Sequence, residues 1–300
     1  MSIKVLLFGA NGNLGSMIKK YSFASNSEIE LISWTREDGN VTQFDLVKEK
    51  LLQIKPNVVI NTIAYNGVDA CEDDEKEQEN AKKLNIDFIR LLCEICLEIN
   101  AQFITFSTNY VFSGKKEYYV ESDLTDPINF YGYTKKIGEE IVTEYIQKGL
   151  TASILRVANL FGENEVGKSS KKNFFDAIIE ASIKQKKLHV VDDEKCCFTY
   201  TKDVAKVIET FVNRPNDMKG IHHVINSGEA KTWYQATKIL FDKLDIHVDV
   251  EPINGLELAR KAKRPRSAVL KVTNSNTPIL RDFNQALDEY IYYLQIKLNE

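Results

Sequence analysis

Short apolar, β-branched segments alternate with longer amphipathic ones in the first half of this 300-residue chain, and this alternation limits its possible folds most strongly. Each amphipathic segment is long enough to be a crossover helix, so the pattern predicts βαβ units. Because such crossovers are right-handed, we expect an α/β fold with a Rossmann-type doubly wound parallel sheet. The predicted strands are residues 3–8, 29–34, 57–61, 102–107 and 151–157, and the predicted helices lie near 14–22, 45–54, 79–99 and 131–148.

After residue 157 the alternation loosens, which predicts a second and smaller part of the molecule. We expect residues 1–158 to form a dinucleotide-binding domain, with 188–226 rejoining its sheet. Residues 159–187 and 227–300 would form a substrate-binding lobe over the carboxyl ends of the strands, where open α/β sheets bind ligands. In this half we expect helices at 173–186, 230–243, 255–262 and 278–298, and strands at 188–191 and 222–226.

Composition excludes several classes of protein. A net charge of -4 and a pI near 5.8 disfavour a general binder of nucleic acids or membrane surfaces. No apolar run approaches the roughly 20 residues of a membrane span, and the first residues lack a signal peptide, so we expect a cytoplasmic protein. Cys93 and Cys96 fall within a helical pattern and are expected in the core, and the cysteines and histidines form no metal-ligand pattern.

The segment GANGNLG, residues 9–15, follows the first strand and opens a helix. Glycines at these positions allow the backbone to approach a pyrophosphate, and the exposed N–H groups and the helix dipole attract phosphates. The context of strand, turn and helix therefore predicts a dinucleotide site. Its members would be Gly9, Asn11, Gly12, Asn13, Leu14 and Gly15.

The end of the second strand bears on the choice of cofactor. NAD-binding sites commonly carry an Asp or Glu there for the ribose hydroxyls, but this chain reads SWTRED, with Arg36 nearest the strand end. A guanidinium suits a 2′-phosphate, so we expect NADPH, with NADH still possible. The alternative is that Arg36 is only a surface charge.

Tyr131 and Lys135 lie four residues apart in YGYTK and therefore share a helix face. The ammonium of Lys135 is expected to lower the pKa of the Tyr131 phenol, which could then protonate an alkoxide formed by hydride transfer. Thr108, at the end of a predicted strand, could hydrogen-bond the carbonyl oxygen. These three residues are the predicted catalytic group.

With these motifs in place, the chain resembles the extended short-chain dehydrogenases/reductases, and among them the dTDP-4-dehydrorhamnose reductase family. The resemblance runs nearly end to end. It rests on GANGNLG (9–15), FDL (44–46), VVINTIAYNGVDACE (58–72), STNYVFSG (107–114), YGYTKKIGEE (131–140), LRVANLFG (155–162), NFFDAI (173–178), TKDVA (201–205), HHVINSGEAKTWYQ (222–235) and RPRSAVL (264–270).

The resemblance implies roles for further residues. Asp45 and Leu46 would lie beside the adenine, Ala64 and Tyr65 would line the ribose and diphosphate, and Asn85 would brace the cofactor-side helix. The residues implied on the substrate side are Asn109, Val111, Phe112, Asn159, Asn173, Arg264 and Arg266, the last two as ligands of the nucleotide-sugar diphosphate.

Three positions depart from the family pattern. Asn109 stands where Asp is usual, Asn159 where Trp is usual and Ala268 where Ser is usual, so the sugar is less certain than the reaction. The segment CCFTY (196–200) also lacks the usual small residues and proline.

The predicted function is NAD(P)H-dependent reduction of a 4-keto group on a nucleotide-linked deoxysugar for a surface polysaccharide. A 4-epimerase of the same fold needs the same three residues and stays an alternative, whereas a dehydratase needs carboxylates that Asn109 and Tyr110 do not supply. A non-catalytic regulatory subunit is a third interpretation, disfavoured because Thr108, Tyr131 and Lys135 are all present. A homodimer is also possible.

Overall fold

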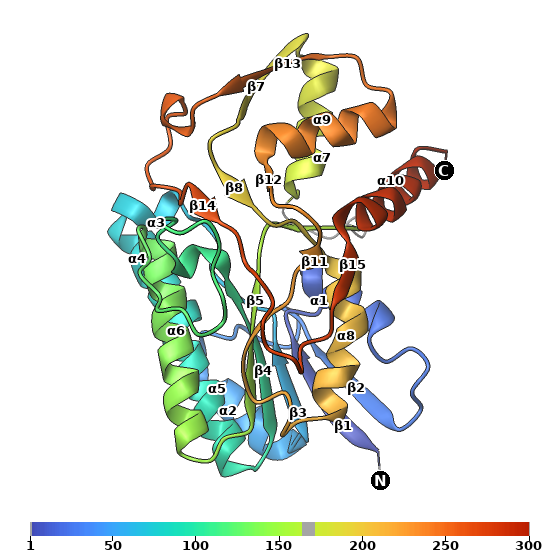
Figure 1. Ribbon diagram of the computed structural model, residues 1–300. Coiled ribbons are helices and arrows are strands. Elements are labelled where there is room, and N and C mark those ends of the chain that lie inside the picture. Colours follow the sequence, from blue (N-terminus) through green and yellow to red (C-terminus); the bar gives the residue numbers. More distant parts are fainter. Residues whose placement is uncertain (1, 164–171, 300) are drawn as a thin grey trace.

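The computed structural model describes residues 2–163 and 172–299. A central parallel sheet flanked by helices forms the larger part, and a smaller lobe lies beyond one end of its strands (Figure 1). None of the helices within these residues is long and apolar enough to cross a bilayer.

The central sheet has six strands in the order β10-β5-β4-β3-β1-β2, and every pairing is parallel. The chain therefore moves outward from β1 in two directions, as expected of a doubly wound sheet. All five strands predicted in the first half are confirmed within two residues at either end. The six strands are β1 (Ile3–Phe8), β2 (Ile29–Trp34), β3 (Val58–Asn61), β4 (Gln102–Thr108), β5 (Ala152–Val157) and β10 (Gly220–His223).

Two layers of helices cover the sheet (Figure 1). One layer is α1 (Asn13–Tyr21) and α8 (Thr201–Asn213), which contact each other. The other contains α2 (Phe44–Ile54), α5 (Phe88–Glu98) and α6 (Phe130–Gln147). The sequence analysis did not identify α8, although its buried positions recur at helical spacing.

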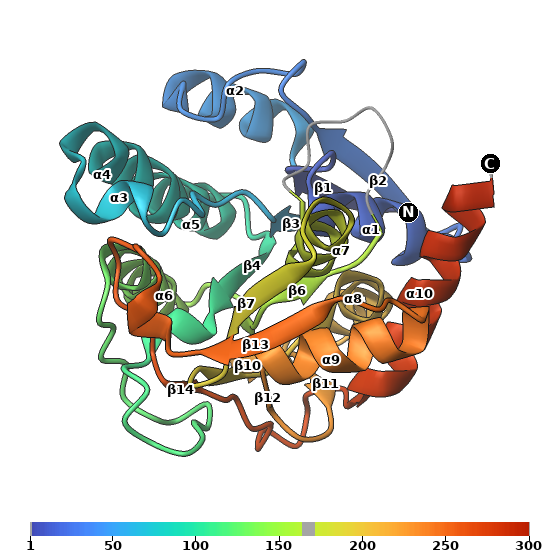
Figure 2. The same cartoon turned by 90° about the horizontal axis from the view of Figure 1, so that it is seen from above.

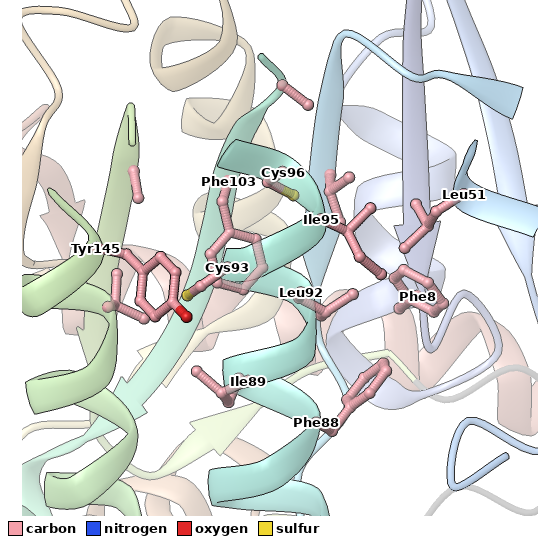
Figure 3. Packing of buried hydrophobic residues seen from close by; sticks show 14 of the residues in the cluster. Phe8, Leu51, Phe88, Ile89, Leu92, Cys93, Ile95, Cys96, Phe103 and Tyr145 are labelled. Carbon is pink, nitrogen blue, oxygen red and sulfur yellow. The ribbon is translucent and has the colours of Figure 1, made fainter. Parts of the chain in front are cut away.

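The core between the sheet and the second layer is built around α5 (Figure 3). Phe88 packs edge to face on Phe8 of β1, with ring centroids 5.4 Å apart. Cys93 and Cys96 lie in this cluster as free, buried thiols, which confirms the prediction for the CxxC pair. Burial of both thiols raises their pKa values, so neither is a reactive thiolate.

The helix expected over 79–99 is longer and is interrupted. It follows the short α3 (Ala70–Asp73) and begins as α4 (Glu75–Lys82), where Asp74 accepts hydrogen bonds from the backbone of Lys76 and Glu77. A π-helical turn, Lys83–Asp87, then leads into α5. Such turns are frequent at functional sites, and this one contains Asn85.

The lobe packs three helices on short strand pairs around an aromatic core that includes Phe161, Phe175, Tyr200 and Tyr290. Its helices are α7 (Phe174–Lys184), α9 (Trp233–Leu244) and α10 (Phe283–Asn299). Its strand pairings are β6 (Leu160–Phe161) with β9 (Thr199–Tyr200), β7 (Lys187–Val191) with β13 (Asp249–Ile253), β11 (Asn226–Ser227) with β15 (Leu280–Asp282), and β8 (Lys195–Cys196) with β12 (Lys231–Thr232) and β14 (Ser267–Ala268).

Some expectations for the second half are wrong. Of residues 188–226, only β10 joins the central sheet, because β7 pairs with β13 in the lobe. The helix expected at 255–262 is a single 3₁₀ turn, Gly255–Glu257. Its apolar side chains find no core to pack on, since Leu256 is 86% exposed and Leu258 39%. The predicted segment 278–298 begins as β15 before α10 starts.

A buried ion pair fastens α6 to the sheet. Arg156 of β5 donates through Nε and Nη2 to the two carboxylate oxygens of Glu139, at 2.9 and 2.7 Å. The side chains are only 2% and 5% exposed. Arg156 also donates to Nε2 of His223, whose Nδ1 lies 2.9 Å from the Lys271 carbonyl oxygen. Because this network is satisfied internally, it orients α6 without leaving a charge unpaired.

We predict that Glu139→Ala lowers the free energy of unfolding by about 3–5 kcal/mol, because it leaves the Arg156 guanidinium buried without a counter-charge. Urea unfolding measures this loss. The control is Glu144→Ala, which removes an exposed pair with Lys148 on the same helix and should cost no more than about 1 kcal/mol. Equal losses in the two variants would contradict the prediction.

Candidate active site

The glycine-rich turn between β1 and α1 is compact for a steric reason. Gly9 has φ +79°, and a Cβ on it would lie 2.6 Å from the Thr62 hydroxyl. A Cβ on Gly15 would lie 2.1 Å from the Gly9 carbonyl oxygen. The first turn of α1 can therefore pack against the end of β1 only because both residues are glycine.

The start of α1 also has unused hydrogen-bonding capacity. Gly12 precedes the helix without a side-chain cap, and Oδ1 of Asn13 is buried with no partner among the described residues. Asn11 lies partly exposed in the turn, and Leu14 is buried in the core beneath it. Free backbone donors at a helix N-terminus fit the diphosphate of a dinucleotide, whereas the Asn13 oxygen needs a donor such as a hydroxyl group.

The residues predicted around the adenosine lie at the same edge of the sheet. Arg36 is exposed in the turn after β2, as a 2′-phosphate ligand would need to be. Asp45 and Leu46 occupy the first turn of α2, where Asp45 is exposed and Leu46 contacts the turn through Gly39.

Asn85 ties the segment after β3 to α6. Its Oδ1 accepts from the Tyr65 backbone N–H at 2.9 Å, and its Nδ2 donates to the Tyr65 carbonyl oxygen at 3.1 Å and to the Thr134 hydroxyl at 3.0 Å. Ala64 and Tyr65 are thus held in place, and Tyr65 donates its hydroxyl to Glu77 at 2.6 Å. This bracing is the role that the resemblance implied for Asn85.

The predicted catalytic side chains meet at the carboxyl end of β4. Thr108 ends that strand and accepts from the Tyr110 backbone N–H at 3.2 Å. Tyr131 enters from the first turn of α6 and donates to Asn66 at 3.4 Å. Burial raises the pKa of Tyr131 to about 12, although a hydrogen bond with the Thr108 side chain acts in the opposite direction.

The expectation that Lys135 lowers the pKa of Tyr131 is therefore wrong for this arrangement. The Lys135 ammonium donates to the Phe106 carbonyl oxygen at 2.8 Å, and burial of the phenol dominates. Lys135 itself is buried, which lowers its pKa to about 8 against the raising effect of the Glu139 carboxylate. A small cavity behind Lys135 is lined partly by Asn85, Ser107 and Glu139.

A second small cavity lies between the strand ends and the lobe. It brings together two of the predicted substrate residues, Asn109 and Asn159. The Asn109 amide donates to the Ala268 carbonyl oxygen at 3.2 Å, and that of Asn159 to the Cys197 carbonyl oxygen at 3.1 Å. The lining is Asn109, Tyr110, Asn159, Glu194, Lys195, Cys196, Trp233, Pro265 and Ala268.

Besides Arg264 and Arg266, three predicted substrate residues do not line this cavity. Val111 and Phe112 are fully buried, and Phe112 stacks on Tyr119 with ring centroids 4.2 Å apart. Asn173 caps α7 by accepting from the backbone of Phe175 and Asp176, and its amide donates to the Gly162 carbonyl oxygen. Their side chains serve packing and capping, so the assignment of these three to the substrate is not supported by their positions.

The two predicted diphosphate ligands differ in their surroundings. Arg266 is exposed, whereas Arg264 forms a bidentate ion pair with Asp69. Burial of Asp69 opposes its ionisation, but the hydrogen bonds from Arg264 and from the Ala262 backbone outweigh it and lower the pKa of that carboxyl.

Sequence reasoning also missed several residues of the cavity, among them Glu194 and Trp233. Glu194 is buried and forms a bidentate ion pair with Arg260, 66 positions later. Trp233 opens α9 and packs against Phe174, with centroids 4.6 Å apart. No local spacing signals the pairing of Glu194, while Trp233 lies within a stretch that resembled the family.

The fold and the clustered side chains define the class of protein first. A parallel Rossmann-type sheet, a glycine-rich turn after β1 and a Tyr–Lys pair on α6 beside β4 are the arrangement of short-chain dehydrogenases/reductases. Within that class, the chain belongs to the family described as RmlD substrate binding domain, whose family model matches residues 3–296.

Comparison with individual proteins confirms the family resemblance. The chain is 32% identical over 290 residues to a probable dTDP-4,6-dihydroxy-2-methyloxan-3-one 4-ketoreductase of Streptomyces antibioticus, covering 95% of this chain and 93% of that protein. It is 29% identical over 292 residues to the spore coat polysaccharide biosynthesis protein SpsK of Bacillus subtilis, covering 96% of each. The solved dTDP-4-dehydrorhamnose reductase of Bacillus anthracis, in complex with NADP, matches with a TM-score of 0.87 and 25% identity, over 98% of this chain and all of that one.

We predict that Asn85→Asp lowers the free energy of unfolding by at least about 2 kcal/mol, because it buries a charge and replaces a donor facing the Tyr65 carbonyl oxygen with an acceptor. It should also weaken NADPH binding by loosening residues 64–65. Urea unfolding and fluorescence titration measure the two effects. The matched control is Asn80→Asp, exposed on α4, which should stay within about 0.5 kcal/mol of the parent.

Proposed function

We propose that this protein reduces the 4-keto group of a nucleotide-linked deoxysugar with NADPH and that Tyr131 supplies the proton. The observation that carries the proposal is the convergence of the Tyr131 phenol and the Thr108 hydroxyl at the carboxyl end of β4. The glycine-rich turn lies at the same edge of the sheet, after β1.

The dinucleotide is held by residues 1–158 in this proposal. Backbone N–H groups at the start of α1 bind its diphosphate, Arg36 binds the 2′-phosphate, and Asp45 with Leu46 borders the adenine. When bound, NADPH supplies a hydride. Ala64 and Tyr65, held by Asn85, exclude water from the cofactor side of the cleft.

The proton step depends on Tyr131 and Thr108. A phenol with a pKa near 12 stays protonated at neutral pH, and an alkoxide is a much stronger base than a phenolate. Proton transfer from Tyr131 to the forming alkoxide is therefore favourable even without a lowered pKa. The Thr108 hydroxyl orients the carbonyl oxygen toward the phenol.

The Lys135 ammonium has a separate role in this proposal. It lies on the same face of α6 as Tyr131 and is directed toward the end of β4 by its bond to the Phe106 carbonyl oxygen. There it binds the cofactor by charge-assisted hydrogen bonding.

The sugar lies between the strand ends and the lobe built from α7, α9, α10 and their strand pairs. Residues 164–171 and 300 of the predicted substrate-binding lobe lie outside the described residues. Asn109 and Asn159 line the cavity there, as does Pro265, which lies between Arg264 and Arg266 in the chain. In this proposal the two arginines bind the diphosphate. The names of the two relatives support a 4-ketoreductase that acts on precursors of a surface polysaccharide. In this proposal the enzyme works in the cytoplasm.

Tyr131→Phe should reduce kcat by roughly 10²- to 10⁴-fold with a dTDP-linked 4-keto sugar, because it removes only the proton donor. NADPH affinity should be unchanged. NADPH oxidation followed at 340 nm measures the rate, and analysis of the sugar product shows whether a reduced sugar accumulates.

The matched control for this variant is Tyr133→Phe, two residues away on α6 and 47% exposed, which should keep full activity. Sugar turnover without net NADPH consumption would favour the epimerase instead. Full activity of Tyr131→Phe would contradict the assignment of the proton donor.

The pKa of Lys135, about 8, predicts how kcat/KM changes with pH. Lys135 is protonated below pH 8, so the rate should be maximal there and fall as the pH rises through 8 and the ammonium is lost.

Lys135→Arg retains its charge above pH 12, so NADPH binding by this variant should stay constant between pH 7 and 10. The control is Lys136→Arg, which should keep the wild-type profile, and a wild-type profile that is flat to pH 10 would contradict the assignment.

A further inference from the structure

Residues 260–267, here called the strap, connect the lobe to the helices beside Tyr131. The strap leaves β13 and descends to the ends of α3 and α6 before it enters β14 (Figures 1 and 2). On the lobe side, Arg260 pairs with Glu194, and the Lys195 backbone N–H donates to the Arg266 carbonyl oxygen at 2.8 Å. The strap thus spans the cleft between the two parts.

On the other side, the strap is bound to the segment that supports Tyr131. Nδ2 of Asn129 donates to the Lys263 carbonyl oxygen at 2.9 Å, while Oδ1 of the same residue caps α6 at Gly132. The Ala262 backbone N–H donates to Asp69 at 3.0 Å, and Lys261 pairs with Asp73 at 2.8 Å. These contacts hold the strap independently of the Arg264 side chain.

Both terminal nitrogens of the Arg264 guanidinium donate to the Asp69 carboxylate. Nη1 donates to Oδ1 at 3.0 Å and Nη2 to Oδ2 at 2.6 Å. This is the geometry in which arginine also binds a phosphate group. Arg264 lies beside Tyr110, whose ring packs edge to face on Tyr131 with centroids 6.1 Å apart. The Tyr110 ring therefore connects the Arg264 guanidinium with the predicted proton donor.

The two ion pairs of the strap differ in how easily they can be broken. The Glu194 side chain is 8% exposed, so its carboxylate would stay buried without a counter-charge if Arg260 left. The Asp69 side chain is 41% exposed and can be hydrated where it stands. Of the two arginines, Arg264 is the one that can exchange an anionic partner at small cost.

We propose that Asp69 is a built-in competitor of the substrate, and that the diphosphate of the nucleotide-sugar displaces its carboxylate from the guanidinium fork of Arg264. This inference rests on the proposed function, because it requires a substrate with a diphosphate. Asp69 then limits substrate affinity, keeps Arg264 oriented between catalytic cycles and assists product release by re-forming the ion pair.

The test measures binding of thymidine 5′-diphosphate by isothermal titration calorimetry, with the full-length protein saturated with NADPH. Asp69→Asn keeps an oxygen that can accept from the Ala262 backbone and removes the competing charge. We expect its Kd to fall about 3- to 10-fold, the effect of one partly exposed charge pair. Asp69→Ser serves the same purpose if the amide variant folds poorly in a thermal melt.

Two further variants separate competition from a general electrostatic effect. Asp73→Asn removes one negative charge from the same short helix, in an exposed pair with Lys261, and should leave the Kd unchanged. Arg264→Ala should weaken binding at least about 10-fold, and adding Asp69→Asn to it should produce no further change.

The outcomes distinguish this inference from the proposed function. An equal or higher Kd for Asp69→Asn, or an equal decrease for Asp73→Asn, would overturn the competition. If Arg264→Ala binds thymidine 5′-diphosphate normally while the enzyme still reduces a nucleotide-linked 4-keto sugar, only the proposed displacement of Asp69 by the diphosphate fails. If the wild type neither binds the diphosphate nor reduces such a sugar, both proposals fail.

Discussion

The arrangement of this molecule depends on how α6 is fixed against the sheet, and the buried pair of Arg156 with Glu139 joins the middle of that helix to β5. The Arg156 guanidinium of β5 donates to the two carboxylate oxygens of Glu139, in the middle of the helix, at 2.7 and 2.9 Å. One turn earlier in α6, the Lys135 ammonium reaches the Phe106 carbonyl oxygen in β4. Because α6 is bound to two adjacent strands, the face that carries Tyr131 has little freedom to rotate or slide.

The start of α6 is held by different parts of the chain. Glu72 of α3 accepts from the Phe130 backbone N–H at 2.9 Å, and Asn129 joins the helix cap to the strap. Asn85 binds the same helix through Thr134 and the cofactor-side segment through Tyr65. The side chain predicted to protonate the substrate is therefore positioned jointly by the segments predicted to bind cofactor and substrate.

Much of the first half could be predicted from the sequence because its signals are local. The short apolar, β-branched segments predicted five strands, the amphipathic segments predicted the helices between them, and the GANGNLG turn lies where its glycines are sterically required. The same reasoning failed at residues 255–262, where an apolar pattern has no surface to pack on. It failed also for β7, since hydrophobicity identifies a strand but not the strand with which it pairs.

For the candidate site too, local motifs could be identified from the sequence, whereas partners far away in the chain could not. Tyr131, Lys135 and Thr108 could be identified because their spacing has a direct physical meaning. The partners of Arg264 and Arg260 could not, because Asp69 lies 195 positions and Glu194 lies 66 positions away in the chain. The family resemblance implied that Val111 and Phe112 contact the substrate, yet tertiary packing places both side chains in a core.

Burial acts in opposite directions on the two ionisable groups of α6. It raises the pKa of the Tyr131 phenol to about 12 and lowers that of the Lys135 ammonium to about 8, because low polarity disfavours the charged form of each. The ordinary pKa values of a phenol and of a lysine ammonium are similar. Burial alone would therefore leave a neutral amine beside a neutral phenol at any pH between the two shifted pKa values. Glu139 opposes this outcome by raising the pKa of Lys135. The carboxylate that anchors α6 through Arg156 thus also helps Lys135 to remain charged at neutral pH, and this links the stability of the helix to the chemistry proposed for its first turns.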